Sequence, residues 1–312
     1  MSNFSKPLEA VSNVPPQSEE GTLINIPVSD APSIRGGKKL RVAVLGNGNV
    51  AQQIIATMNL DRTEYKVFDK ETSKSPIDDV IEYGPNLTFI CVNVSFLQND
   101  TLDDAELIDI ISKLLKQTEG GVCLKTTINP ETCGRIISID GAESEGFASR
   151  FVYSPETTHS SDPLATMRAN EIVLGGVEAA VNAHVSVLDV HFIQNYTKII
   201  RLPFMEAVLL VMGVSAFTAI KQTFFSQMAE VTEEHDVPFN RIRRIMANTN
   251  IVNDLSYSVP PIEKSRHDNT VSLKMAKGFG GEYLNHDVKS LLGVTDKMPL
   301  LDECINWKNV KG

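Results

Sequence analysis

One turn near the start of the chain has the residue types and spacing of a dinucleotide-binding loop. It reads Gly-x-Gly-x-x-Ala, follows the apolar run Leu40–Leu45 and opens a helical pattern. At such a strand-to-helix turn the first backbone N–H groups of the helix can face a pyrophosphate, and Gly48 has no Cβ to block its approach. The pattern predicts dinucleotide binding by Gly46, Gly48, Asn49, Val50 and Ala51.

A carboxylate lies at the position from which such sites recognise the adenosine ribose. Asp69 follows Gly46 by 23 positions and ends the second predicted strand, Tyr65–Phe68. There it can accept hydrogen bonds from the ribose hydroxyls and repel a 2′-phosphate. The sequence therefore predicts NAD rather than NADP as the cofactor. The alternative is a turn with two glycines and a surface aspartate that bind no ligand.

The elements around this turn predict an α/β fold. Apolar runs alternate with helical stretches such as 52–58 and Ala105–Leu115, a pattern typical of parallel βαβ units. Because the stretch between Asp69 and Leu87 is short, we expect the sheet to lack one of the usual strand–helix units. We predict a Rossmann-type parallel sheet domain over residues 39–200. Its predicted strands are Leu40–Leu45, Tyr65–Phe68, Leu87–Val94, Gly121–Leu124 and Glu171–Leu174.

Beyond Arg201 the strand pattern stops, and we predict an all-helical domain over residues 201–312. Residues Glu206–His235 read as one helix of about 30 residues, which would span about 45 Å. The first half of this helix is apolar on nearly every side, so it must be covered. We expect it to be buried and to pair two subunits in a homodimer.

Composition and charge exclude several classes of function. The 29 basic and 39 acidic residues give a net charge of -10, and no block of Lys and Arg is present that could bind a nucleic-acid backbone. The longest apolar stretch, Ala207–Ile220, is shorter than the ~18–20 residues of a membrane-spanning helix, and the N-terminus shows no export signal. We expect a soluble, cytoplasmic protein with no nucleic-acid or membrane partner.

The four cysteines do not form a metal-binding or disulfide pattern. They lack CxxC spacing and are too sparse for a disulfide scaffold. We therefore expect reduced thiols and no metal site. The four are Cys91, Cys123, Cys133 and Cys304.

Residues 1–38 differ in composition from the rest of the chain. They are rich in Ser, Pro, Glu and Gly and show no sustained hydrophobic periodicity, so they bury too little apolar surface to offset the entropy of ordering. We predict a flexible N-terminal arm, which is also a candidate for contacting a partner.

Five further segments stand out along the chain: Phe89–Ser95, Leu124–Thr132, Ser154–Glu156, Asn170–Gly175 and Lys277–Asp287. In the same order they resemble the motifs "FICVPTP", "IKSTVPPGT", "SPE", "DRIVIG" and "PGFGGSCFPKD" of the UDP-glucose and GDP-mannose 6-dehydrogenases. The resemblance covers most of residues 40–310. It implies an enzyme that oxidises the C6 alcohol of a nucleotide sugar to a carboxylate with two NAD, and that pairs subunits through its long helix.

Carried over by position, the resemblance implies roles for several residues. Thr127 would order a catalytic water and, with Val92, contact the cofactor. Glu156 would lie beside the sugar, and Asp287 would support the catalytic base. The residues alone leave other interpretations open: Thr127 as a strand-end residue, Glu156 as a helix-capping carboxylate, and Asp287 as the N-cap of a helix over Val288–Leu292.

The chain departs from the family where the family performs its chemistry. Tyr283 replaces the cysteine that forms the covalent thioester, and a phenol with a pKa of about 10 is a poor substitute nucleophile. Val211 and Ser215 replace the Lys and the Asn of the long helix, and loss of a positioned acid or base costs about 10²–10⁴ in rate. The family has a second Rossmann-like domain that holds the substrate nucleotide, and we expect this domain to be missing after Trp307.

One position near the end of the last motif offers a replacement base. His286 replaces the lysine that precedes the aspartate in the family motif. An imidazole titrates near neutrality, so His286 is a candidate general base. The alternative is a histidine in a surface loop.

We therefore expect an NAD-binding relative of these dehydrogenases that cannot perform the four-electron oxidation, hence a pseudoenzyme or an enzyme for one hydride transfer. Candidate substrates are a nucleotide sugar or a small alcohol. One alternative is an active two-electron dehydrogenase of the β-hydroxyacid type, which needs a Lys on the long helix. Val211 counts against it, because Lys221 lies ten residues further on, on a different face of the helix. Another is a structural or assembly protein that keeps the fold for its surfaces and uses the arm as its contact element.

Overall fold

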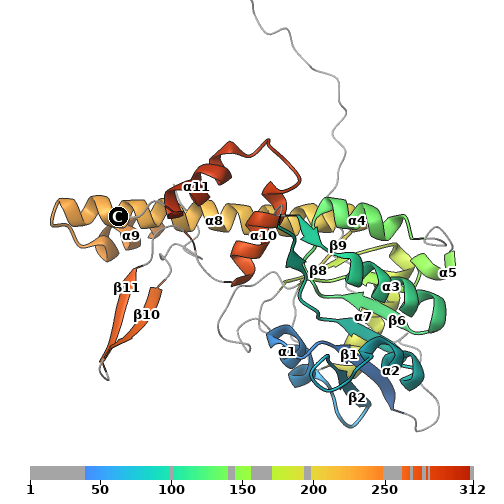
Figure 1. The fold of residues 1–312 in the computed structure, drawn as a ribbon. Coiled ribbons are helices and arrows are strands. Elements are labelled where there is room, and N and C mark those ends of the chain that lie inside the picture. Colours follow the sequence, from blue (N-terminus) through green and yellow to red (C-terminus); the bar gives the residue numbers. More distant parts are fainter. Residues whose placement is uncertain are drawn as a thin grey trace, which may run out of the picture. The chain divides into compact units, whose positions relative to one another are not determined.

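A seven-stranded sheet in the order β2-β1-β3-β6-β7-β8-β9 organises the chain (Figure 1). The computed structural model describes residues 39–98, 101–139, 145–155, 171–192, 198–248, 262–267, 270–275, 279 and 282–309. Neighbouring strands are parallel except β7 and β8, which are antiparallel. The predicted α/β fold is confirmed; the reversal at β8 was not predicted. The strands are β1 (Leu40–Leu45), β2 (Thr63–Phe68), β3 (Leu87–Ile90), β6 (Gly121–Leu124), β7 (Phe151–Tyr153), β8 (Glu171–Gly175) and β9 (Lys198–Leu202).

The sheet is short at the β2 edge, as expected. The stretch between Asp69 and Leu87 contains one helix, α2 (Pro76–Tyr83), and no strand. β2 therefore ends the sheet, and the chain returns past β1 to form β3 on its other side. The direction of strand addition reverses between β1 and β3, which is the point where ligands bind in doubly wound sheets.

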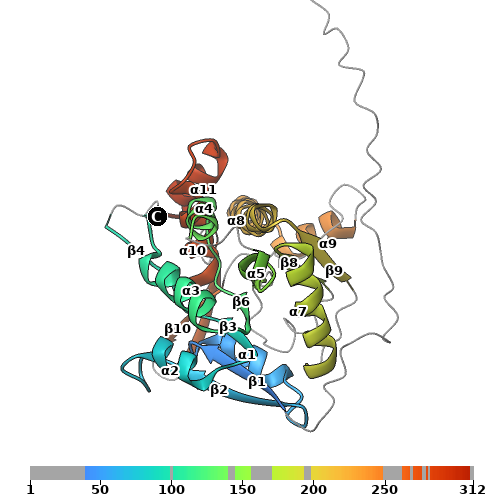
Figure 2. The ribbon, with the colours of Figure 1, turned by 90° about the vertical axis from the view of Figure 1, so that its right-hand side faces the viewer.

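Helices cover both faces of the sheet, which explains why β1 is apolar on both sides (Figure 2). Val42 and Val44 pack with α1 (Asn49–Thr57) and α7 (Glu178–His191). Ala43 and Leu45 belong to the larger core cluster, which includes residues of α2 and of two further helices. These two helices are α3 (Ala105–Gln117) and α4 (Pro130–Ile137), and a single helical turn, α5 (Glu145–Ala148), precedes β7.

The long helix α8 (Phe204–Glu234) has 31 residues and confirms the prediction to within two residues at either end. It meets the length and hydropathy criteria of a membrane span, with a mean hydropathy of 1.7 over an 18-residue window. One side of it joins the large core cluster through residues such as Ala207, Met212 and Ala219. Gly175 of β8 permits this packing, because a Cβ there would lie 2.5 Å from the Cβ of Ala207. Burial inside the protein thus accounts for much of its apolar composition.

The chain after α8 is mostly helical, but it also contains an element that the sequence did not reveal. An antiparallel pair, β10 (Ile262–His267) and β11 (Thr270–Met275), lies in the segment predicted as all-helical. The sheet also extends through β9 to Leu202, two residues past the expected domain boundary. Residues 1–38 lie outside the described residues, so the arm stays a prediction. The remaining elements are a short pair, β4 (Ser95–Phe96) and β5 (Leu102–Asp103), and the helices α9 (Phe239–Asn248), α10 (Glu282–Leu292) and α11 (Pro299–Asn309).

Candidate cofactor and catalytic site

The glycine turn lies at the carboxyl end of β1, at the reversal point of the sheet. Gly46 has a φ of +101°, and a Cβ at this position would lie 2.5 Å from the carbonyl oxygen of Cys91. Only glycine fits there, because the loops after β1 and β3 touch. Gly48 is exposed, and a Cβ there would meet no atom of the described residues within 4 Å. The space in front of Gly48 is therefore open, as a pyrophosphate requires.

The start of α1 is open to a ligand in a second respect. Gly48 is the N-cap residue, and no side chain caps the first N–H groups at Asn49 and Val50. Helix N-termini of this kind bind anionic groups through those N–H groups and the helix dipole. The side chain of Gln52 donates to Asn47 Oδ1 at 2.6 Å and so braces the turn. The residues present fit a dinucleotide phosphate at this place.

Asp69 follows β2 directly and is held in a turn. Its Oδ1 accepts a hydrogen bond from the backbone N–H of Glu71 at 2.9 Å, and its carbonyl oxygen accepts from the N–H groups of Thr72 and Ser73. The described residues offer no donor to its second carboxylate oxygen. This half-buried carboxylate thus keeps an acceptor for a ribose hydroxyl.

The loop that carries Thr127 is fixed at both ends. Thr126 Oγ1 donates to the carbonyl oxygen of Val92 at 2.7 Å. Asn129 caps α4 by accepting from the N–H of Thr132 at 2.8 Å. Thr127 lies between these anchors, half-buried, and its hydroxyl bonds to none of the described residues. Its hydroxyl is therefore available to a water or a ligand, and its neighbour Thr126 links it to Val92 on the loop after β3.

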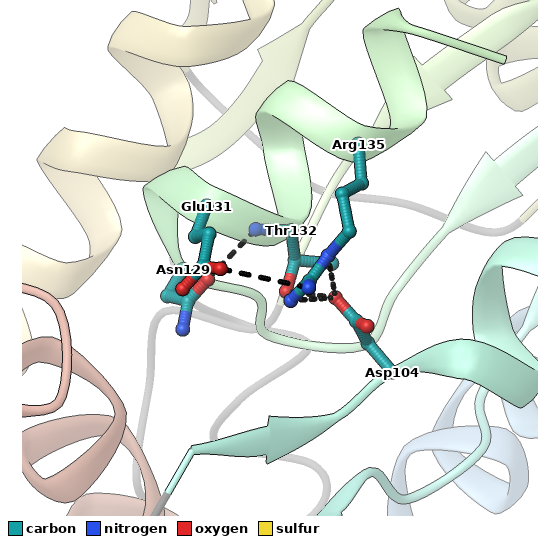
Figure 3. A network of polar contacts seen from close by, with 5 residues as sticks. All are labelled: Asp104, Asn129, Glu131, Thr132 and Arg135. Atoms are coloured by element: carbon teal, nitrogen blue, oxygen red, sulfur yellow. Dashed lines mark hydrogen bonds and ion pairs between the residues drawn. The ribbon is translucent and has the colours of Figure 1, made fainter.

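A buried carboxylate ties the start of α3 to α4 and so supports this loop (Figure 3). Asp104 Oδ2 accepts from Thr132 Oγ1 at 2.5 Å and from Arg135 Nε at 3.0 Å, and Arg135 Nη2 lies 2.8 Å from the same oxygen. Glu131 pairs with Arg135 at 3.5 Å. Charge-assisted bonds to one buried acceptor are the strong kind, so this network fastens the first turns of α4, where the loop ends, to the start of α3.

The helices α8 and α10 meet at a buried polar pair. Ser215 Oγ donates to Asp287 Oδ2 at 2.7 Å, and each residue is 2% exposed. Val211, one turn before Ser215, is buried as well. The interpretation of Asp287 as an N-cap of a helix over 288–292 is wrong, because α10 begins at Glu282. The hydroxyl hydrogen of Ser215 is thus directed at the carboxylate of Asp287.

His286 lies next to this pair and contacts the loop after β3. Its Nε2 lies 2.9 Å from the carbonyl oxygen of Val94, and its Nδ1 lies 3.5 Å from Asp287 Oδ1. Both ring nitrogens therefore face acceptors of the protein. Glu156 lies outside the described residues. Tyr283 lies in the first turn of α10, but its side chain is not among those described.

Sequence reasoning missed a cation at the carboxyl end of β6. Lys125 Nζ lies 3.5 Å from Ser154 Oγ, at the end of β7. On the same side of the sheet lies the buried His184 of α7, and desolvation, followed by the charge of Lys125, lowers the pKa of His184 to about 3. Cys123 and Lys125 are two positions apart, so along a strand their side chains point to the same face of the sheet. This spacing was the signal in the sequence that could have revealed the cation. No carboxylate among the described residues pairs with Lys125.

None of the four cysteines has the properties of a nucleophile. Burial raises the pKa of the Cys91 thiol above its ordinary range and that of the Cys123 thiol to about 12. It raises the pKa of Cys133 to about 12 as well, and that of Cys304. A reactive cysteine needs a lowered pKa and access to solvent. The described residues also contain no cluster of three His, Cys, Asp or Glu side chains that could hold a metal ion.

No protein-family model and no curated protein matches the sequence. Solved structures match in fold. A UDP-glucose dehydrogenase from Pyrobaculum islandicum is 16% identical, with 88% of this chain and 69% of that chain covered and a TM-score of 0.66. A GDP-mannose dehydrogenase from Pseudomonas aeruginosa is also 16% identical, with 86% of this chain and 68% of that chain covered and a TM-score of 0.58. A 3-hydroxyisobutyrate dehydrogenase from Mycobacterium tuberculosis is 14% identical, with 69% of this chain and 72% of that chain covered and a TM-score of 0.51.

At these identities the likeness concerns the fold. The structural matches include both classes of dehydrogenase weighed from the sequence, and the UDP-glucose and GDP-mannose dehydrogenases cover more of this chain than the 3-hydroxyisobutyrate dehydrogenase does. The resemblance drawn from five short motifs is confirmed at the level of architecture: this chain has the fold of the nucleotide-sugar dehydrogenases.

Proposed function

We propose that this protein binds NAD at the carboxyl ends of β1 and β3 and does not perform the four-electron oxidation of a nucleotide sugar. The observation that carries the proposal is a contrast within one site. The open glycine turn and Asp69 suit a dinucleotide, whereas Tyr283 and Val211 occupy the sequence positions where the motif resemblance implies a thiol and an amine.

The cofactor would be held by groups that the fold already positions. The N-terminus of α1 would bind the pyrophosphate, Asp69 the adenosine ribose, and the loop at Val92 with Thr127 the nicotinamide side. When bound, NAD would supply a hydride acceptor. The protein's own part is to exclude water and to orient an alcohol, with Thr127 as the available hydroxyl.

The second oxidation lacks its covalent route. That step requires a thiol to attack the aldehyde, so that hydride loss leaves a thioester. Tyr283 occupies the corresponding position in the sequence, and burial holds all four cysteines of the chain in the thiol form. An acid product would have to arise by another route.

The first oxidation lacks the usual amine. Val211 is buried and Ser215 is engaged with Asp287, so α8 offers no proton acceptor there. Lys221 does not compensate, because its Nζ lies 6.0 Å from the ring centre of Phe217, a residue that is 65% exposed. This placement on the outer side of α8 counts against an active β-hydroxyacid dehydrogenase.

We further propose that the protein is a soluble, cytoplasmic homodimer paired through α8. The outer side of this helix carries exposed apolar residues every seven positions, which is the repeat of paired helices. The row is Leu210, Phe217, Phe224 and Val231. An exposed apolar row of this length is typical of a protein–protein interface. In a twofold dimer the same row on a second copy of α8 would pack against it.

The proposal is tested by separating binding from turnover. Calorimetric titration with NAD, NADH and NADP measures binding, and we expect NAD and NADH to bind. Absorbance of NADH and mass spectrometry then follow UDP-glucose, GDP-mannose and small hydroxy acids. We expect no uronate from either nucleotide sugar, also for Tyr283→Cys, because Val211 and Ser215 remain.

Three results would change the proposal. Two NADH per sugar would refute it, since the site would then complete both oxidations. One NADH per hydroxy acid would favour the two-electron dehydrogenase. No binding of either cofactor form would favour a structural protein that keeps only the fold.

A further inference from the structure

The loop after β3 is fastened through two of its carbonyl groups. Thr126 Oγ1 donates to the carbonyl oxygen of Val92 at 2.7 Å, from the end of β6. His286 Nε2 lies 2.9 Å from the carbonyl oxygen of Val94, from α10. Asn93, between them, is exposed. The two contacts fix the backbone on both sides of Asn93, at the point where the loops after β1 and β3 meet.

The chemistry of these contacts defines the protons on His286. A carbonyl oxygen only accepts hydrogen bonds, so Nε2 must carry a hydrogen in any form that makes the contact with Val94. Nδ1 faces Asp287 Oδ1 at 3.5 Å, and an ionised carboxylate likewise only accepts. Only the imidazolium therefore provides a hydrogen to both neighbours. In the neutral form the free lone pair lies on Nδ1, which faces Asp287, so in this arrangement neither nitrogen is open to take a proton from a substrate.

The groups around His286 come from three elements. On α10, Asp287 lies on one side, and Lys289 places its Nζ 4.8 Å from the ring centre of Phe96. On the loop and β4, the Val94 carbonyl and the Phe96 ring face it, with ring centres 4.9 Å apart. On α8, Ser215 bonds to the other oxygen of Asp287. A continuous set of polar contacts thus runs from α8 through α10 to the loop after β3.

We propose that His286 is a positioning residue that ties the loop 92–96 to Asp287, and that it does not act as the general base. The imidazolium makes both contacts, whereas the neutral ring keeps only the contact with Val94. This inference rests on the proposed NAD site, because the tied loop forms the nicotinamide side of that site. NAD should accordingly bind more tightly when His286 is charged.

Histidine ¹⁵N NMR tests the tie itself, without any cofactor. The His286 signal is assigned by its loss in His286→Gln. We expect the neutral ring to carry its hydrogen on Nε2. A neutral form with its hydrogen on Nδ1 would overturn the proposal, since the Val94 carbonyl would then lack a donor.

Hydrogen exchange and calorimetry test the consequence. In His286→Ala we expect faster amide exchange over 92–96 and NAD affinity about fivefold weaker, the size of one lost hydrogen bond. His286→Lys restores a cation and should stay within about twofold of the unmodified protein, whereas His286→Gln keeps a donor for Val94 but should lose the pH dependence of NAD binding. The control is His235→Gln, at an exposed position.

The outcomes separate this inference from the proposed function. If the unmodified chain binds no NAD, the proposed function fails, and exchange over 92–96 alone decides whether the tie exists. If NAD binds and His286→Ala changes neither exchange nor affinity, the positioning role is refuted. If NAD binding has the same pH dependence in His286→Gln as in the unmodified protein, the charge of His286 has no part in it.

Discussion

Gly48→Ala is the sharpest test of the cofactor site, because it adds one methyl group to the space a phosphate would occupy. The Cβ would meet no heavy atom of the described residues within 4 Å, so the protein has no steric reason for glycine there. The backbone at this position has a φ of -75° and a ψ of -174°, which alanine adopts readily. Any large effect must therefore come from a ligand.

The expected effect on stability is small. Alanine in place of glycine restricts the unfolded chain, which stabilises the protein by about 0.4–1 kcal/mol. Alanine is a poorer N-cap residue than glycine, which costs a similar amount, about 0.5–1 kcal/mol. The two effects offset each other, so the free energy of unfolding should change by no more than about 0.5 kcal/mol.

The expected effect on binding is large. A Cβ in front of the uncapped start of α1 would hold the pyrophosphate away from the N–H groups of Asn49 and Val50. Loss of one hydrogen bond to a charged group is worth about 1.5–3 kcal/mol, which corresponds to about 10- to 150-fold in the dissociation constant.

Calorimetric titration with NAD measures this change, and thermal unfolding without NAD checks the fold. Gly134→Ala in α4 is the matched control, because a Cβ there also meets nothing within 4 Å. NAD affinity that is equal in the unmodified protein and in Gly48→Ala would refute the assignment of this turn as the phosphate site. A loss of stability of several kcal/mol would refute the reasoning about open space.

Three further predictions concern cofactor choice, pH and assembly. In Asp69→Asn the preference for NAD over NADP should fall by about tenfold or more, since the repulsion of a 2′-phosphate is lost. Calorimetry with both cofactors measures this preference, and an unchanged ratio of the two affinities would contradict the role of Asp69. Because burial lowers the pKa of His184 to about 3, the unfolded chain takes up the proton first as the pH falls. Stability from this group is present above the unfolded pKa of about 6.5, and about 1.4 kcal/mol of it should be lost between about pH 7.5 and about pH 5.5. Denaturant unfolding of His184→Leu should show a smaller loss, and an equal loss would speak against the burial argument. Phe217→Glu should give monomers in light scattering, while Leu300→Glu, at a residue that is 62% exposed on α11, should not; an unmodified protein that is monomeric at micromolar concentration would refute the dimer.

Local patterns were sufficient for the parts of the fold that rest on short-range rules. The apolar run before Gly46, the glycine spacing and the helical stretch after it predicted β1, the turn and α1, because each follows from neighbouring residues. The length and apolar composition of α8 predicted it to within two residues at either end. The short stretch between Asp69 and Leu87 predicted the missing unit at the β2 edge, because a strand–helix unit needs a minimum length of chain.

Short and non-local elements were missed. β7 has three residues and β9 five, and apolar runs this short do not distinguish a strand from part of a buried helix. The hairpin β10–β11 was missed as well, although Asp268 and Asn269, the types favoured in tight hairpin turns, separate its strands in the sequence. The antiparallel direction of β8 depends on where the chain returns to the sheet, and local sequence does not encode that.

The amino-acid sequence by itself determined the candidate NAD turn, the carboxylate at Asp69, and the presence of Tyr283, Val211 and Ser215 where the motif resemblance implies a cysteine, a lysine and an asparagine, because these follow from residue types at set spacings. Only the tertiary structure decided that Asp287 lies within α10 against Ser215, that His286 reaches Val94 across 192 positions of sequence, and that burial keeps the cysteines unreactive. Hydrogen bonds and desolvation depend on which groups lie within a few ångströms in space, and that is settled by packing of the whole chain.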